Sequence, residues 1–222
     1  MRMTWHDLLF MHWPLAAELL QPHIPPTLEL DLYHGTAWVG VIPFHMTDVR
    51  PAALPGFMAS AFPEVNVRTY VRFKGRSGVW FFSLDAADRM AVWAARRFFH
   101  LPYHHAEMSS VSKNGVFEYR SRRRSNPEVA FIARYAPTGE VQYASPGSLE
   151  YWLTERYSLF SVDPRGRMFR VDVEHQPWPL QPAEADVAIN RMTLPLRVDI
   201  ATARPLLHFA KRVDVESSRL QS

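Results

Sequence analysis

Hydrophobic and polar residues alternate over much of the chain, in short runs that turn residues interrupt. The alternation is clearest over residues 64–73, where Val and Phe occupy one face of an extended chain. The opposite face of this segment carries Glu64, Asn66, Arg68, Tyr70 and Arg72. Gly75 and Gly78 follow, and the apolar run 79–84 comes next. The two segments are therefore predicted to pair as a β-hairpin.

Several further segments have the composition and length of strands, and each is bounded by Gly, Pro, Asn or Asp. They are residues 37–44, 116–122, 129–135, 168–175 and 206–215. The 18 prolines are scattered between short elements, which argues against an architecture of long helices. Short strands at this spacing indicate a β-sandwich or a β-barrel.

Helical signals are fewer and lie between the predicted strands. The predicted helices are residues 15–21 with Pro14 at the start, residues 86–99 after the capping residue Asp85, and residues 149–153 after the capping residue Ser148. Together with the strands, they predict a β-rich fold with a few peripheral helices.

The composition fits one globular domain that spans residues 1–222. Of these 222 residues, 47% are hydrophobic and 13% are aromatic, which is enough material for a packed core. Cysteine is absent, so disulfide scaffolds, thiolate metal sites and cysteine nucleophiles are excluded. Because His6, Asp7 and Glu18 interrupt the first 20 residues, we predict neither a signal peptide nor a membrane span there. We expect a cytoplasmic protein without a membrane partner.

The basic residues are almost all arginine. Among the 25 basic residues only Lys74, Lys113 and Lys211 are lysines, and the formal net charge is +3. A chain with so few lysines offers few candidates for a Schiff base, whereas arginine binds carboxylates or phosphates through two parallel hydrogen bonds.

The densest basic run consists of Arg120, Arg122, Arg123 and Arg124. Residues 125–127 read Ser-Asn-Pro, which is a turn signal. The run therefore indicates the solvated end of a hairpin, with an anion or nucleic-acid site as the alternative. We do not expect a nucleic-acid partner.

The strongest candidate site follows a helix that Pro102 is expected to end. Residues 93–105 read WAARRFFHLPYHH and place Tyr103, His104 and His105 side by side, three groups that can transfer protons. In an extended chain His104 and His105 point in opposite directions, so at most one is expected to face a given cavity. The alternative is a turn whose rings cover one end of the fold. We predict no metal site, because the spacing of these histidines matches no metal-binding motif.

Six segments, in this order and over nearly the whole chain, carry a resemblance to a known family. They read HWPLAAELLQPHIPPTLELDLYHGTAWVGVIPF, FPEVNVRTYV, GVWFFSLDA, LPYHHAEM, GSLEYWLTERYSLF and HQPWPL. With them the chain resembles the YqjF-like family of uncharacterised bacterial proteins, which is itself similar to the acetoacetate decarboxylases. The resemblance implies a mainly β fold: a cone-shaped antiparallel β-barrel with a ligand cavity inside it and a few peripheral helices.

The resemblance to the decarboxylases stops at their catalytic lysines. In those enzymes a helix that carries an arginine leads to an aromatic residue, a proline and two adjacent lysines, the first of which forms the Schiff base. Here Arg96 lies on the matching helix, but Tyr103 and His104 stand where the lysines would be. Neither a phenol nor an imidazole forms a stable iminium ion with a ketone, so we predict that Schiff-base decarboxylation is absent. No cofactor is predicted.

The resemblance also places Glu64 where the decarboxylases have an active-site glutamate. We therefore predict that Glu64, Tyr103 and His104 are the catalytic candidates of one interior site. The predicted ligand-binding residues are Asn66, Arg68, Tyr70, Arg96 and Trp178. Two alternatives stay open: the polar face of residues 64–72 as ion pairs exposed to solvent, and Trp178 as a core residue rather than a lid over the cavity.

Three classes of function follow from these observations. The first is an enzyme that performs acid/base chemistry on a small carbonyl or carboxylate compound. The second is a small-molecule binding module without catalysis. The third is an anion-binding or nucleic-acid-binding protein that uses Arg120–Arg124. We favour the first class, with a small anionic or carbonyl-bearing ligand as the partner. The sequence identifies neither the substrate nor the reaction, and it leaves open whether the chain forms a homo-oligomer.

Overall fold

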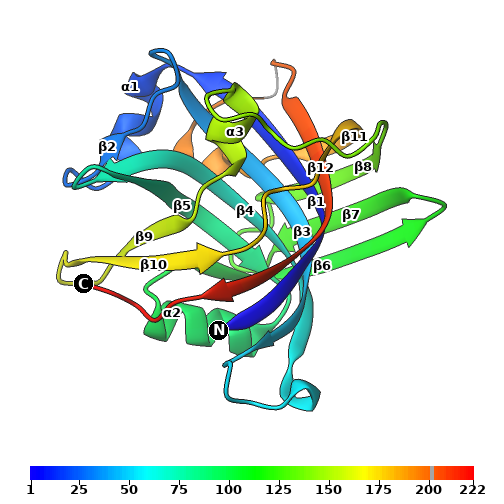
Figure 1. Cartoon of the computed structure of the whole chain (residues 1–222), viewed down its shortest axis with the longest axis horizontal. Helices are drawn as coiled ribbons and strands as arrows, with labels where there is room; N and C mark the ends of the chain where they lie inside the picture. Colours follow the sequence, from blue (N-terminus) through cyan, green and yellow to red (C-terminus); the bar gives the residue numbers. More distant parts are fainter. Residues whose placement is uncertain (201–202) are drawn as a thin grey trace.

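A computed structural model gives the structure of residues 1–200 and 203–222. The strands are β1 (Arg2–Leu15), β2 (Glu29–Leu30), β3 (Ala37–Arg50), β4 (Ser60–Phe73), β5 (Arg76–Ala86), β6 (Tyr103–Lys113), β7 (Val116–Arg123), β8 (Ala130–Pro137), β9 (Ser158–Val162), β10 (Met168–Glu174), β11 (Leu180–Asn190) and β12 (Leu206–Ser217). The helices are α1 (Ala17–Leu20), α2 (Arg89–Phe98) and α3 (Leu149–Thr154), with short 3-10 helices at Gln21–His23, Gly56–Met58 and Leu194–Leu196. Within the described residues the strands form one sheet of 12, in the order β10-β9-β5-β6-β7-β8-β11-β12-β1-β3-β4-β2 (Figure 1).

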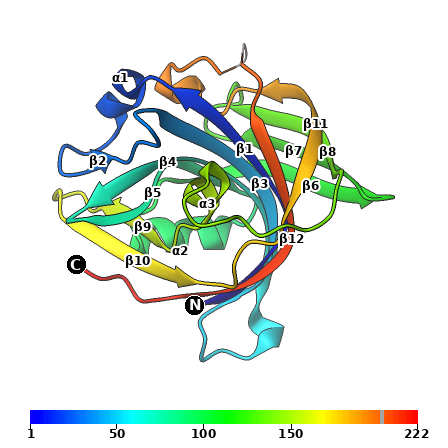
Figure 2. The same ribbon diagram turned by 45° about the horizontal axis from the view of Figure 1, so that its top comes forward.

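The sheet closes on itself, because two further pairings join strands that are distant in this order. β5 also pairs with β4, and β10 also pairs with β12. Figure 2 shows the resulting ring, in which β1, β3, β4, β5, β9, β10 and β12 surround the helices α2 and α3. In Figure 1 α3 lies at the upper end of this ring and α2 at the lower end. The predicted β-rich fold with a few peripheral helices is confirmed.

β5 is the strand at which the ring and the rest of the sheet meet. Near its start it pairs in parallel with β9, at Val79 and Trp80, and its last residues pair in parallel with β6, from Leu84 to Ala86. Along its other edge it pairs with β4. The sheet continues from β6 through β7, β8 and β11, and the side chains of β7 and β8 pack against β1 and β4 from outside the ring.

Residues that alternate along β4 lie in two different cores. Val65 and Val67 pack with Tyr119 of the outer layer. Phe62 packs on the inner face of the ring. Glu64 follows on this inner face and is only 2% exposed. β4 is therefore buried on both faces over this stretch, so the alternative of ion pairs on a solvated face is wrong for Glu64. Only Arg72, near the end of the strand, is exposed on this face, and it forms an ion pair with Asp31.

The predicted start of the helix at residues 86–99 is wrong by three residues. Asp85 does not cap α2, because it lies in β5. Asp88 is the cap instead, and its carboxylate accepts hydrogen bonds from the backbone N–H groups of Met90 and Ala91 at 2.8 and 3.0 Å. The strand continues past Asp85 because Ala86 still pairs with β4 and β6.

Pro14 does not begin a helix either. β1 runs to Leu15, and α1 begins only at Ala17. Pro14 pairs with Trp38 of β3, whereas the pairing of β1 with β12 ends at His12. Proline has no N–H group to donate. Because β12 does not pair with β1 beyond His12, this lack costs no hydrogen bond to β12, and strands tolerate proline along such an unpaired edge.

The helices are short. α2 spans 10 residues and α3 spans 6. Within residues 1–200 and 203–222, no helix combines the length and the apolar character that crossing a membrane requires.

Gly78 allows β5 and β9 to approach each other closely. A Cβ atom at this position would lie 2.6 Å from the backbone oxygen of Ser158 and 2.7 Å from the ring of Phe160. Because the nearest obstacle is backbone, we expect Gly78→Ala to lower the free energy of unfolding by about 1–3 kcal/mol, the usual cost of overpacking. Urea denaturation measures this change. Gly56→Ala is the control, since a Cβ there meets nothing within 4 Å, and equal stability of the two variants would contradict the expectation.

Candidate functional site

Glu64 and Tyr103 meet on the inner face of the ring, across the strand that lies between them. β4 and β6 flank β5, with Glu64 beside Ala86 and Tyr103 beside Leu84. Neighbouring strands are about 4.8 Å apart, so roughly 10 Å separates the two backbones, a span that two long side chains can bridge. The Tyr103 hydroxyl donates a hydrogen bond of 2.7 Å to Oε2 of Glu64. The structure thus brings these two predicted residues together.

Burial dominates the electrostatics of Glu64. It raises the pKa of the carboxyl group to about 8, although hydrogen bonds from Tyr103 and Asn66 act in the opposite direction. The carboxyl group is therefore largely protonated at neutral pH and can donate a proton. Burial and the neighbouring Glu64 also raise the pKa of the Tyr103 phenol well above its usual value. At pH 7 both members of the pair carry their protons.

His104 does not share the position of Tyr103. Successive residues of a strand face opposite sides, and His104 lies beside Asp85 on the side away from Glu64. Burial, followed by the charges of Arg123 and Arg96, lowers the pKa of His104 to about 4, so its imidazole is neutral at pH 7. The alternative that Tyr103, His104 and His105 lie in a turn is wrong, because β6 begins at Tyr103.

His105 and Arg96 line hollows next to Tyr103. A surface groove of about 510 Å³ between α2 and β6 is lined by His105, Arg96 and Trp93, among others. A second hollow of about 520 Å³ is lined by Arg96, Leu101 and other residues of the segment before Tyr103. Arg96 is exposed and lines both hollows, whereas Tyr103 lines neither of them.

The predicted ligand-binding residues of β4 separate into two groups. Asn66 lies next to Glu64 on the inner face, level with Leu84 and Tyr103. Arg68 lies further along β4, beside Phe81, and its Nη2 donates a hydrogen bond to the backbone oxygen of Leu153 at 3.4 Å. The Tyr70 hydroxyl instead lies 2.7 Å from Nε2 of His12, within hydrogen-bond distance. The convergence of all four β4 residues on Tyr103 is thus not observed.

Trp178 is a buried side chain of the inner core. Its indole is 2% exposed and packs edge-on against Phe10, with ring centroids 4.9 Å apart, and parallel to Trp5 at 6.0 Å. Its backbone N–H donates a hydrogen bond to Oε1 of Glu155 at 3.0 Å. The position fits the core alternative rather than a lid.

Arg123, from the basic run, is not a surface residue. Its guanidinium donates hydrogen bonds of 2.7 to 3.1 Å to both carboxylate oxygens of Asp85, and the two side chains are 5% and 0% exposed. This pair joins β5 to β7 across β6. The positive charge of Arg123 also helps to lower the pKa of the neighbouring His104.

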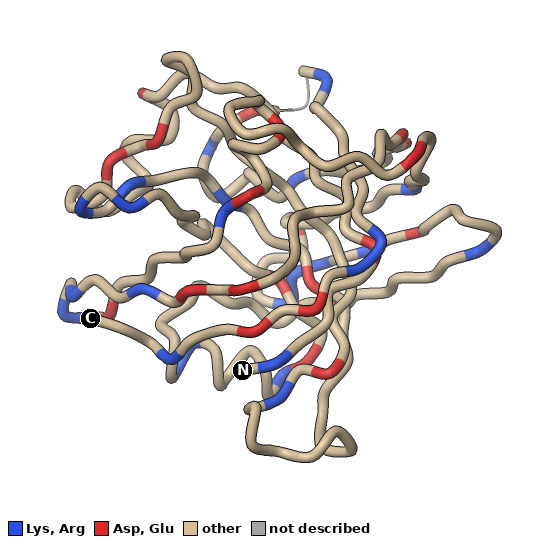
Figure 3. Tube along the Cα trace, in the orientation of Figure 1, with Lys and Arg blue, Asp and Glu red and all other residues tan. Residues whose placement is uncertain are grey.

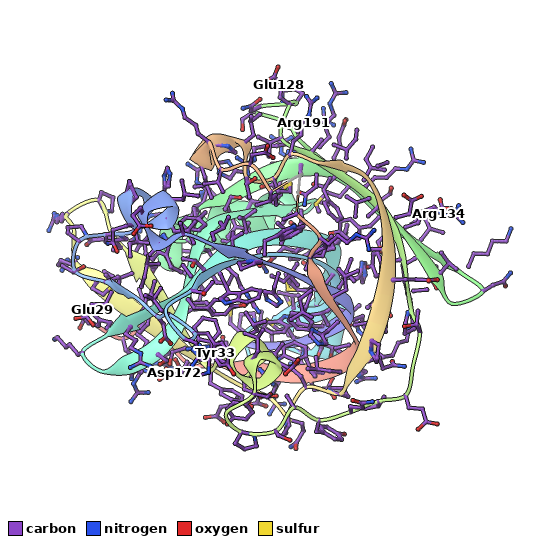
Figure 4. The ribbon with its side chains drawn as sticks, turned by 90° about the horizontal axis from the view of Figure 1, so that it is seen from above. Glu29, Tyr33, Glu128, Arg134, Asp172 and Arg191 are labelled. Carbon is purple, nitrogen blue, oxygen red and sulfur yellow. The ribbon has the colours of Figure 1, made fainter. Side chains whose placement is uncertain are left out.

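The remaining arginines of the run are mixed with acidic residues. Arg120, Arg122 and Arg124 are exposed, and Arg124 forms an ion pair of 2.6 Å with Glu107. A hollow of about 590 Å³ is lined by Arg120, Arg122 and Arg191 but also by Glu107 and Glu128. Figure 4 shows Glu128 and Arg191 together at one edge of the molecule. Figure 3 shows basic and acidic residues interspersed along the chain rather than gathered into one basic face.

Three further residues lie near Tyr70: His12, Asp31 and Arg156. For Arg156 in the segment LTERY, the sequence leaves open a buried ion pair with a carboxylate and a ligand clamp, whereas His12 and Asp31 are not predicted as site residues. Asp31 is 3% exposed and forms an ion pair of 2.7 Å with Arg156, which lies over the ring of Tyr70 at 5.1 Å. No motif joins these three positions. The pairing of β1 with β3 and of β3 with β4 brings His12 to Tyr70, and the pairing of β2 with β4 brings Asp31 there. No single segment of the sequence shows these pairings.

Sequence comparison connects the chain with one family over nearly its whole length. The sequence profile of DUF2071, a family of uncharacterised conserved proteins, matches residues 2–214. The uncharacterised protein YqjF of Bacillus subtilis (strain 168) is 46% identical over 216 residues, which are 97% of this chain and 89% of YqjF. The resemblance to YqjF-like proteins is confirmed.

Solved structures with little sequence identity share the fold. The enduracididine biosynthesis enzyme MppR complexed with pyruvate has a TM-score of 0.68 at 13% identity, with 99% of this chain and 89% of MppR covered. The acetoacetate decarboxylase of Legionella pneumophila has a TM-score of 0.62 at 12% identity, with 100% of this chain and 88% of the enzyme covered. The expected fold class is therefore confirmed. Sequence and structure together show that the chain belongs to the DUF2071 family and has the acetoacetate decarboxylase-like fold.

Proposed function

We propose that the protein binds a small carbonyl or carboxylate compound on the inner face of the ring and transfers a proton to and from it through Glu64, with Tyr103 as a second hydrogen-bond donor. The observation that carries this proposal is the buried pair itself. A carboxyl group with a pKa of about 8 lies 2.7 Å from a phenol, and both are protonated at neutral pH. Perturbed groups of this kind are characteristic of acid/base sites.

The pair supplies two hydrogen-bond donors to a carbonyl oxygen. A ligand oxygen that replaces the hydrogen bond between Tyr103 and Glu64 receives a hydrogen bond from each, which stabilises the negative charge that develops when the carbonyl becomes an enol. A water molecule takes the proton that leaves the neighbouring carbon atom. Glu64 then gives its proton to that oxygen and takes it back when the reaction reverses. Tyr103 keeps its proton throughout, because its pKa stays well above neutral pH.

Schiff-base chemistry is not part of the proposal. Lys74, Lys113 and Lys211 are all exposed, and Lys211 is paired with Asp7 at the surface. The first of them lies in the turn between β4 and β5, away from Glu64. A ketone bound beside Tyr103 therefore meets no amine that could attack it.

Similar structures support the class of ligand. MppR has been seen with pyruvate and with the condensation product of pyruvate and imidazole 4-carboxaldehyde. Other proteins of this fold are acetoacetate decarboxylases. Pyruvate is both a carbonyl and a carboxylate compound, which makes it a reasonable probe for this chain.

Tyr103→Phe tests the proposal. With pyruvate as the probe, exchange of its methyl protons into D₂O, followed by proton NMR, reports enolisation. We expect the variant to exchange at least about 100-fold more slowly than the wild type, because it loses a donor to the enolate oxygen. Its thermal unfolding is expected to stay within a few degrees of the wild type.

Tyr143→Phe is the matched control, since Tyr143 is 65% exposed, and it is expected to exchange at the wild-type rate. A wild type that binds pyruvate in thermal-shift experiments without exchanging its protons would favour the second class of function, a binding module without catalysis. Unchanged exchange in Tyr103→Phe would contradict the assignment of Tyr103.

A further inference from the structure

A second polar cluster lies inside the ring at the end that α3 covers. We call it the α3-end cluster, and it consists of His12, Arg68, Tyr70, Arg156 and Asp31. The guanidinium of Arg68 lies over the rings of Phe10 at 5.6 Å and Tyr70 at 5.8 Å. That of Arg156 lies over Tyr70 at 5.1 Å and over Trp152 of α3 at 4.4 Å. The cluster is separated from Glu64 along β4.

Several nitrogen atoms of this cluster and its surroundings are buried without a hydrogen-bond partner among the described residues. They are Nε of Arg68, Nη2 of Arg156, Nδ1 of His12, Nδ1 of His208 and Nε1 of Trp38. The side chain of Arg156 is only 6% exposed, so its free Nη2 points into the interior. Buried donors are normally satisfied, and a group of them that is not satisfied indicates a ligand that bears acceptors.

The charges of the cluster do not balance. Asp31, with a side chain 2% exposed, forms ion pairs with Arg156 at 2.7 Å and with Arg72 at 2.9 Å, and the side chain of Arg72 is 52% exposed to water. Among the described residues, no carboxylate lies within ion-pair distance of Arg68. Burial and Arg68 hold the pKa of His12 well below its usual value, so His12 adds no charge at pH 7. One positive charge remains without a counter-ion.

Several side chains in and around the cluster near α3 are partly exposed. Arg68 is partly exposed although it projects into the ring, and so are Trp38, Trp152 and His208. Figure 4 shows Tyr33 beside α3, where its ring contacts that of Trp152 with centroids 5.6 Å apart. Aromatic rings thus lie around the guanidinium of Arg68, whose Nη2 donates a hydrogen bond to the backbone oxygen of Leu153.

We propose that the α3-end cluster binds the carboxylate of a small organic acid. Arg68 and the free Nη2 of Arg156 donate hydrogen bonds to the two carboxylate oxygens, and the aromatic rings hold the body of the ligand. A carboxylate carries the single negative charge that matches the uncompensated cation, whereas a doubly charged phosphate exceeds it. Asn66, whose Oδ1 has no partner, lies between Arg68 and Glu64 on the same face. This inference names the ligand class of the proposed function, but the carboxylate site itself does not require proton transfer at Glu64.

Thermal unfolding and calorimetric titration of the full chain test the site. The probes are acetate, pyruvate, benzoate, inorganic phosphate and benzamide, which has the shape of benzoate without its charge. At constant ionic strength we expect at least one of the carboxylates to raise the Tm in a concentration-dependent way, and benzamide to leave it unchanged. Arg68→Gln is expected to weaken carboxylate binding by roughly tenfold to 100-fold, because a charge-assisted contact is lost.

Arg72→Gln is the matched control, because Arg72 shares Asp31 but points towards solvent, and we expect its affinity to stay within about threefold of the wild type. Glu64→Gln separates the two proposals: it is expected to abolish proton exchange while carboxylate binding persists. The inference is overturned if no carboxylate binds, if benzamide or phosphate binds more tightly than every carboxylate, if Arg68→Gln binds as the wild type does, or if Glu64→Gln removes the binding.

Discussion

Arg123→Met is expected to lower the free energy of unfolding by about 3–5 kcal/mol, because it leaves the carboxylate of Asp85 buried without a partner. Asp85 is 0% exposed, and its side-chain hydrogen bonds come from Arg123. Since the pair also joins β5 to β7, its loss removes a connection between the ring and the outer layer. Urea denaturation monitored by tryptophan fluorescence measures the effect.

Two further variants show whether the buried charge is the cause. Arg122→Met changes the exposed neighbour of Arg123 and is expected to alter stability by less than about 0.5 kcal/mol. The double variant Asp85→Leu with Arg123→Met removes both charges, so it is expected to recover most of the lost stability. If the double variant is as unstable as Arg123→Met alone, the loss comes from packing and not from an unpaired carboxylate.

Glu64→Gln is expected to make the protein more stable than the wild type at alkaline pH. The folded protein holds this carboxyl group at a pKa of about 8, against an ordinary value of 4.5. Between these values the unfolded chain has lost the proton that the folded chain keeps, so the stability of the wild type falls as the pH rises. The stabilising contribution is complete below about pH 4.5 and lost above about pH 8, and it corresponds to roughly 4–5 kcal/mol.

The variant has no proton to lose, so its stability does not follow this decline. The free energy of unfolding of the two proteins is therefore expected to be similar at pH 5 and to differ by several kcal/mol at pH 9, with the variant higher. Glu107→Gln, at a side chain that is 57% exposed, serves as control and should follow the wild type at every pH. Parallel pH curves for wild type and Glu64→Gln would show that Glu64 ionises normally in the folded protein.

The strands that the sequence predicts are those with one polar face or with clear turn residues at both ends. β4 and β5 were found from the alternation at residues 64–73 and from the glycines that follow. β1 was missed, because residues 8–13 are buried on both faces and show no alternation: Leu9 and Met11 lie in the outer core, Leu8 and Phe10 in the inner one. A strand that is buried on both faces shows no alternation of hydrophobic and polar residues, so the hydrophobic pattern alone does not distinguish it from a buried helix.

The candidate site was partly predictable for a related reason. The family resemblance marked Glu64 and the segment of Tyr103, and parallel pairing on β5 makes them neighbours. The partners of Arg68 and Tyr70 depend on where β1 and the segment after α3 lie. Both are distant in the sequence, and no local pattern at His12 indicates its place in the interior.

The division of β5 between β9 and β6 limits how this protein can change in length. Between Trp80 and Leu84 the strand passes from one parallel neighbour to the other, while its other edge stays paired with β4 through one register shift, between the pairs Arg68–Phe81 and Val67–Ser83. An inserted or deleted residue there would turn every following side chain of β5 to the opposite face. The displaced register would separate Ala86 from Glu64 and Asp85 from Arg123 at once, so gene duplicates that diverge in length are expected to do so in the loops and to leave this stretch intact.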